Sequence, residues 1–326
     1  MFTGLQHVRG IVHGLWPPRR PRSEVDRSKR GTGKRGYRDA SEQSTEEEEA
    51  AVVPEDVDRD HTFLAGVSTG AVPERNLDVA GLPEGLTTKV LSRSGDGSMS
   101  HLVSVPGGWG IDEPRRLSAT TEIFVLEGSL RIGDHRLEHY SYLRIPAGTA
   151  VSGVEAGADG CRFLLFSTGL LEFEPAADGT EHSRLEPRSL HEMSWVASAT
   201  PGVTPGLLHK RLAEDEETGA RTWIIGLIHW GREISKWETH PCAEEVFFLE
   251  GAMANGEVFP DGTRMIPYEA GGYFYRPADI GHSGPGSGTG TYVIGLCRSS
   301  SAMAVDWHDG PPPFPSRFEA VDFGTL

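Results

Sequence analysis

The sequence has few cysteines and no long apolar run. Its three cysteines, Cys161, Cys242 and Cys297, are scattered and form no Cys-x-x-Cys pair. This argues against a disulfide framework and favours a reducing compartment, the cytosol. No stretch approaches the ~20 apolar residues that span a bilayer, so no membrane contact is expected. The formal net charge of −16 also argues against nucleic acid as a partner, because proteins that bind nucleic acid usually carry an excess of basic residues.

The first 60 residues are poor in large apolar side chains after Trp16. Basic residues dominate as far as Arg38, and acidic residues dominate from Asp39 to Asp60. Such a segment buries too little surface to offset the entropy of ordering it, so we predict a disordered extension over 1–60. An alternative remains open, because the acid-free start "MFTGLQHVRGIVHGLW" is similar to an organelle-targeting leader.

Helical periodicity is scarce beyond residue 60, where short runs of β-branched and aromatic residues alternate with Gly, Pro and Asp. This pattern predicts an all-β protein. The segment 121–153 is echoed by 244–284, and each copy begins with an acid-led apolar strand that closes on Leu-Glu-Gly. A repeat this long indicates two copies of a domain. We predict domains over 61–176 and 206–326, joined by a linker over 177–205 that includes a short helix near 189–195.

The second copy contains a dense group of candidate metal ligands. The run "KWETHPCAEEVFFLEG" places Glu238, His240 and Glu244 before an apolar strand, and "YFYRPADIGH" ends in His282. Glu238 and His240 are two residues apart, so on an extended strand both side chains leave the same face. Glu245 is a rival to Glu244, but strand alternation points the two to opposite faces and the spacing to the next glycine favours Glu244. Two imidazoles and two carboxylates suit Fe(II), Mn(II), Ni(II) or Zn(II).

These residues and the glycines around them resemble the two-part signature of the cupin superfamily, with Glu238 where the first histidine is expected. The whole chain resembles a bicupin, which implies two tandem double-stranded β-helix (jelly-roll) barrels. The segment "THPCAEEVFFLEG" resembles the corresponding segments of zinc-binding cupin-like domains of anti-sigma factors and of small metal-dependent cupin dioxygenases. The resemblance implies one divalent metal per chain, with Fe(II) favoured.

The first copy lacks this ligand set. Alignment of the copies places Arg115, Leu117, Thr121 and Val151 at the four ligand positions. We therefore expect a metal-free first barrel that completes the fold or forms a homodimer surface. A pocket of its own, with an arginine at the mouth, is the alternative.

Arg221, Trp237 and Tyr275 flank the predicted metal site and are the candidate substrate-binding residues. Aromatic walls with a few polar groups are typical of small-molecule sites, and an arginine holds a carboxylate well. The sequence leaves open which alternate residues face inward. We predict an oxygenase for a small dicarbonyl, enol or carboxylate substrate. The alternatives are a zinc-binding sensor module and a non-redox metal-dependent isomerase or hydrolase.

Overall fold

The computed structural model describes residues 52–177, 184–201, 206–227, 236–283 and 292–324. All of them belong to one compact unit, Ala50–Leu326. Strands dominate, and η1 (Pro54–Asp56), a 3-10 turn, is the helical element that lies entirely in the described ranges. Among these residues no helix is long and apolar enough to cross a bilayer. The all-β prediction is therefore confirmed, whereas the disorder predicted for residues 1–51 falls outside the described residues.

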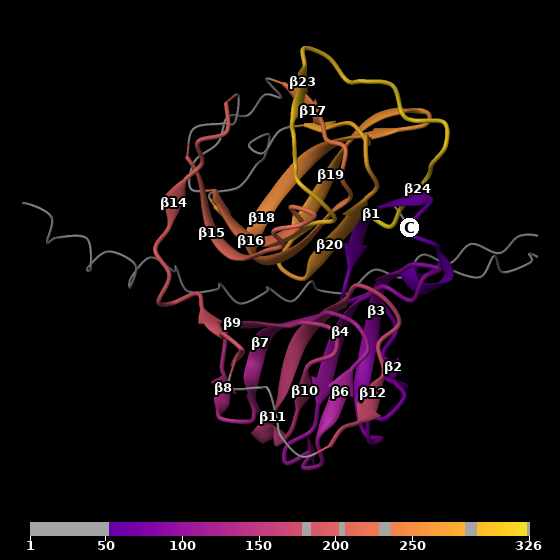
Figure 1. The fold of residues 1–326 in the computed structure, drawn as a ribbon. Coiled ribbons are helices and arrows are strands. Elements are labelled where there is room, and N and C mark those ends of the chain that lie inside the picture. The colour runs from indigo at the N-terminus through magenta and orange to yellow at the C-terminus, as the bar shows by residue number, and fades with distance from the viewer. Residues whose placement is uncertain (1–51, 178–183, 202–205, 228–235, 284–291, 325–326) are drawn as a thin grey trace, which may run out of the picture. The chain divides into compact units, whose positions relative to one another are not determined.

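The first barrel consists of a large antiparallel sheet and a three-stranded sheet that enclose an apolar core (Figure 1). The large sheet runs in the order β13 (Arg188–Ser189), β9 (Ser141–Ile145), β7 (Thr121–Ile132), β11 (Val154–Ser167), β4 (Met99–Val105), β3 (Thr87–Arg93) and β2 (Arg75–Asn76), with β5 (Gly110–Ile111) and β8 (His135–Leu137) beside it. The small sheet contains β10 (Ala150–Val151), β6 (Arg115–Leu117) and β12 (Phe173–Pro175).

The second barrel repeats this plan with more strands. Its main sheet runs in the order β14 (Val196–Ala197), β15 (Leu207–Glu214), β16 (Arg221–Leu227), β22 (Val293–Ser299), β18 (Glu244–Phe259), β20 (Gly272–Arg276), β1 (Thr62–Ser68) and β24 (Glu319–Asp322). The remaining strands are β17 (Trp237–Thr239), β19 (Gly262–Glu269), β21 (His282–Ser283) and β23 (Asp306–His308). The two barrels are jelly rolls, as the cupin resemblance implies.

The domain boundaries differ from the predicted ones at the N-terminal side. Strand β1 pairs with β20 and β24, so residues 62–68 complete the second barrel although the predicted first domain begins at 61. Order also begins before residue 60, because the buried Arg59 donates hydrogen bonds to Ser92, Ser94 and Ser100. Composition cannot reveal these contacts, which join segments more than thirty residues apart.

The predicted linker contributes an edge strand to each barrel. β13 pairs with β9 and β14 pairs with β15, so the short helix expected near 189–195 does not form. Lys210 holds the connecting turn, because its ammonium donates a hydrogen bond to the Leu190 carbonyl and lies over the Trp195 ring. The helix prediction is wrong because tertiary contacts override the local pattern.

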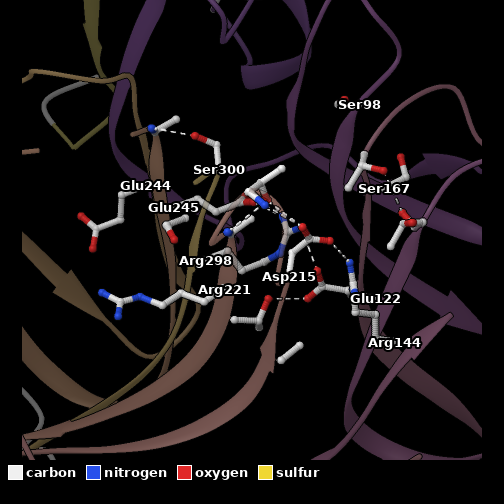
Figure 2. Close-up of a pocket in the computed structure, with 18 of the residues that line it drawn as sticks. Ser98, Glu122, Arg144, Ser167, Asp215, Arg221, Glu244, Glu245, Arg298 and Ser300 are labelled. Carbon is white, nitrogen blue, oxygen red and sulfur yellow. Dashed lines mark hydrogen bonds and ion pairs between the residues drawn. The ribbon is translucent and has the colours of Figure 1, made fainter. Parts of the chain in front are cut away.

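An apolar cluster joins the barrels and contains residues from both, among them Leu91, Phe124, Phe247 and Tyr273. Beside it lies a buried ionic network, in which the Arg298 guanidinium pairs with Glu122 of β7 and Glu245 of β18 (Figure 2). Burial raises the pKa of both carboxyls, but the Arg298 charge and hydrogen bonds from neighbouring hydroxyls outweigh it and leave each pKa below its usual value. The two carboxylates therefore stay ionised and hold one cation between the barrels.

The repeated Leu-Glu-Gly has a backbone cause. Gly128 and Gly251 have φ of +71° and +75°, and each lies two residues after a register shift in its long strand. A Cβ on Gly251 would lie 2.1 Å from the Tyr292 carbonyl oxygen, and one on Gly128 would lie 2.1 Å from that of Gly160. Glycine is required because a side chain would be strained by the positive φ and would collide with backbone.

Gly251→Ala is expected to lower the free energy of unfolding by more than about 2 kcal/mol, because it adds left-handed strain to a backbone clash. Urea denaturation followed by circular dichroism measures the change. Gly95→Ala is the control, since a Cβ there meets nothing within 4 Å. Equal stability of the two variants would contradict this account of the repeat.

Candidate metal centre

The inward-facing residues of the second barrel are fixed by strand register. Arg221 of β16 lies opposite Ser299 of β22, which lies opposite Glu244 of β18, which in turn lies opposite Arg276 of β20. Residues in one such row leave the same face of a sheet. Arg221, Glu244 and Arg276 line a cavity of about 770 Å³ inside the barrel.

The next row along the chain faces the opposite way, toward the first barrel. It contains Thr222, Arg298, Glu245 and Tyr275, which are aligned on neighbouring strands. Glu245 accepts hydrogen bonds from Ser100 and Tyr273 there. Figure 2 shows Arg221 and Glu244 extending away from the Glu122–Arg298 pair. The register therefore decides between Glu244 and Glu245, and it favours Glu244 as the inward residue.

Three of the four predicted ligands form one compact group. One ligand atom each from His240, Glu244 and His282 lie within 4.8 Å of one another. Glu244 Oε2 is 3.5 Å from His240 Nε2 and 4.0 Å from His282 Nε2. Glu238 adjoins the group, because its Oε1 is 3.2 Å from His282 Nε2 and the two residues are paired across β17 and β21. In the described part of the chain, no second group of this kind occurs.

Both imidazoles present Nε2 to the group. His240 Nδ1 lies 2.8 Å from the Cys242 carbonyl oxygen, and His282 Nδ1 lies 3.3 Å from that of Ile280. Such backbone contacts fix the ring orientation of metal-binding histidines. His240 Nε2 is buried without a hydrogen-bond partner among the described residues, so the chemistry of this donor set fits a divalent metal. Cys242 lies beside the ring, with Sγ 3.6 Å from Nδ1, and is outside the ligand group.

Electrostatics within the group favour a charged His240–Glu244 pair. Burial lowers the pKa of His240, but its contacts with Cys242 and Glu244 outweigh this effect and raise the pKa to about 10. Burial raises the pKa of Glu244, whereas His240 and the charge of Arg276 bring it down to about 2. At neutral pH Glu244 is therefore ionised and His240 is protonated, and a metal ion bound to His240 would have to displace that proton.

Sequence reasoning missed a buried ion pair that holds Glu244. Arg276 Nη1 donates to Glu244 Oε2 at 2.5 Å, and Arg276 Nη2 donates to both oxygens of Glu257 at 2.7 and 3.0 Å. Arg276 and Glu257 are each 0% exposed. Asn255 and Tyr268 also donate to Glu257. The sequence feature that could have indicated this ion pair is the charged Arg276 within an otherwise apolar strand, "YFYRP".

Of the three predicted substrate-binding residues, one lines the cavity and two do not. Arg221 lines the cavity, together with residues such as Trp223 and Phe248. Tyr275 is on the other face of β20, where the Arg59 guanidinium lies 4.8 Å from its ring centroid. Trp237 is buried beside β21 and β23 and is not among the cavity-lining residues.

The first barrel has the same geometry with different residues. Arg115 and Val151 are paired across β6 and β10 in the way that Glu238 and His282 are paired in the second barrel. Thr121 lies opposite Ile145, as Glu244 lies opposite Arg276. The space here is about 60 Å³ and has an almost wholly apolar lining. The sequence alignment of the two copies thus matches equivalent positions.

Two jelly-roll barrels in tandem, one of which carries a cluster of candidate histidine and carboxylate ligands, form the architecture of a bicupin. Residues 85–301 match the model of the family described as "Domain of unknown function (DUF4437)", and the chain belongs to that family. No curated protein matches the sequence.

Two solved structures are similar to the chain, and the first of them shares its fold. A candidate dioxygenase from Nostoc punctiforme PCC 73102 has a TM-score of 0.61 and 18% identity, over 78% of this chain and 88% of that chain. Oxalate decarboxylase from Bacillus subtilis has a TM-score of 0.49 and 15% identity, over 74% of this chain and 78% of that chain. These likenesses do not show the expected similarity to anti-sigma-factor domains.

Proposed function

We propose that the chain is a metal-dependent oxygenase with one divalent metal in its second barrel, held by Glu238, His240, Glu244 and His282. Fe(II) is favoured, with Mn(II), Ni(II) and Zn(II) as alternatives. The proposed substrate is a small dicarbonyl, enol or carboxylate compound. The observation that carries the proposal is the approach of two buried imidazoles and a carboxylate to one point on the wall of a cavity of about 770 Å³.

The chain's own residues prepare this site in two ways. Arg276 and Glu257 fix one carboxylate, so that Glu244 keeps its orientation without losing rotamer entropy when a metal binds. Arg221, on the same cavity wall, provides a guanidinium for a substrate carboxylate. A bound divalent metal supplies Lewis-acid polarisation of a substrate oxygen and, in the case of Fe(II), the capacity to react with O₂.

The test is O₂ uptake by the anaerobically Fe(II)-loaded protein against a panel of dicarbonyl, hydroxy-acid and phenolic compounds. We expect substrate-dependent uptake with Fe(II) and none with the Zn(II)-loaded control. Turnover with Zn(II) but without O₂ would instead identify a non-redox isomerase or hydrolase. Tight ligand binding without turnover on any metal would contradict the enzyme and favour a sensor.

Metal stoichiometry tests whether the second barrel binds a metal and the first does not. We expect close to one metal per chain, because Leu117, Thr121 and Val151 offer the first barrel no histidine or carboxylate. Two metals per chain by elemental analysis would contradict this assignment. The homodimer and the cytosolic location remain predictions.

A further inference from the structure

The inner face of the main sheet changes from charged to apolar along the strands. Arg221, Glu244 and Arg276 form the charged row. Two residues further into the sheet, Trp223, Cys297, Val246 and Phe274 are aligned across four strands, and they are followed by Ile225, Gly295 and Phe248. All of these except Gly295 line the cavity. At ~3.3 Å per residue, the rows are about 7 Å apart.

Arg221 differs from the other arginines on this wall. Arg276 is paired with Glu244 and Glu257, and Arg211 is paired with Glu214. Among the described residues no carboxylate pairs with Arg221, which is the difference from Arg276; the Nε atoms of both are buried without a hydrogen-bond partner. Its guanidinium lies 4.7 Å from the Trp223 ring centroid, at the border between the charged and apolar rows. A guanidinium with a buried Nε and no carboxylate partner gains free energy when it pairs with an anionic ligand.

The position of Arg221 relative to the metal ligands sets where an anion would lie. Arg221 and Glu244 are aligned through β22, so their Cα atoms are two strand spacings apart, or about 10 Å. Both side chains are on the inner face. A ligand carboxylate paired with the Arg221 guanidinium therefore lies in the same row as Glu244. The rest of that ligand extends over the apolar rows. A cavity of about 770 Å³ exceeds what a two-carbon acid fills.

We infer that the ligand of this cavity is an amphipathic monocarboxylic acid with a medium-length alkyl chain or an aryl ring. Its carboxylate pairs with Arg221, and its apolar part packs on Trp223, Val246, Phe248 and Phe274. The inference deepens the proposed function and rests on it for the statement that such an acid is the substrate. Substituents next to the carboxylate then face the proposed metal.

The experiment is isothermal titration of the Zn(II)-loaded and metal-free protein with octanoate, butyrate and octanamide. Full burial of one methylene tightens binding by about fourfold. We expect octanoate to bind at least about tenfold tighter than butyrate, since part of the chain stays near the cavity mouth. Octanamide should bind at least about tenfold more weakly than octanoate, because it cannot form the charge-assisted pair. Equal affinity for octanoate and butyrate would overturn the inference.

Variants assign the carboxylate to Arg221. Arg221→Met should weaken octanoate binding by at least about tenfold and leave octanamide binding and metal content unchanged. Arg221→Lys keeps the charge, and its octanoate affinity should lie between those of the unsubstituted protein and Arg221→Met. This variant provides the test if Arg221→Met fails to fold. Arg211→Met is the matched control, because Arg211 is on the same wall but paired and half-exposed. Octanoate binding that is unaffected in Arg221→Met and Arg221→Lys would contradict the assignment.

The two proposals fail in different ways. Octanoate binding through Arg221 in a protein that takes up no metal supports the ligand class and overturns the proposed oxygenase. Metal binding and O₂ uptake without octanoate binding support the oxygenase and overturn the ligand class.

Discussion

Replacing either His240 or His282 by alanine is expected to lower the metal content from close to one per chain to less than about a tenth of that value. Each variant removes one of two imidazole donors from a group whose ligand atoms lie within 4.8 Å of one another. The remaining carboxylates and one histidine leave a site that binds divalent transition metals much more weakly. Elemental analysis after anaerobic loading with Fe(II) or Mn(II), followed by gel filtration, measures the content.

A control histidine lies close to the group but outside it. His308 of β23 contacts the Thr239 hydroxyl at 3.0 Å through Nε2 and takes no part in the ligand group. His308→Ala should therefore retain its metal. If all three variants retain metal equally, or if the unsubstituted protein remains empty after loading, the metal centre is wrong.

The largest stability effect is expected from Arg298→Met. Arg298 is the cation between Glu122 of the first barrel and Glu245 of the second, and its side chain is 14% exposed. Removal of one partner of a buried ion pair typically costs about 3–5 kcal/mol, because the remaining charge is buried without compensation. We expect the free energy of unfolding to fall by about that amount at pH 7, measured by urea denaturation.

A matched control is a more exposed ion pair that lines the same pocket between the barrels as Glu122 and Arg298 (Figure 2). Arg144 pairs with Asp215 at 3.0 Å, and about a third of each side chain is exposed. Arg144→Met should cost less than about 1 kcal/mol because solvent screens the pair. The triple variant Arg298→Met, Glu122→Gln, Glu245→Gln should recover part of the stability lost in Arg298→Met. Equal losses in the two single variants would contradict the role of the buried network.

The pH dependence of this effect has a defined sign. With Arg298 present, the pKa of Glu122 and that of Glu245 lie below their usual values, so the carboxylates stabilise the fold above about pH 4.5 and this contribution is lost as the pH falls. Without Arg298, burial dominates and favours the protonated carboxyls. The difference in stability between the unsubstituted protein and Arg298→Met should therefore narrow between pH 7 and pH 4. A difference that widens would contradict the assignment.

The sequence predicted the fold class and much of the candidate site because the signals are local. The alternation that separates Glu244 from Glu245 is a property of any strand, and the structure places the two on opposite faces. The Leu-Glu-Gly repeat marks Gly128 and Gly251, where a positive φ excludes other residues. Ligand spacing within 238–244 depends on one strand and one turn, so the sequence alone could predict the candidate ligands in this segment.

Other features depend on partners that are distant in the chain. The sequence could not show that β1 completes the second barrel, because its partners begin about two hundred residues later. It could not show that Arg276 is neutralised by Glu257, nineteen residues away and fully buried. Tyr275 was expected at the cavity because the parity of β20 was open; register with Glu245 turns it toward the first barrel.

By itself, then, the sequence determined the all-β character, the internal duplication and the candidate metal ligands, because periodicity, glycine conformation and donor type are properties of short segments. Tertiary structure alone decided which faces meet. Strand register places the side chains of Arg221 and Glu244 on the face that lines the cavity, and that of Arg298 on the opposite face, between the barrels. The reason is that the hydrogen-bonded register across a sheet fixes the face of every side chain in it.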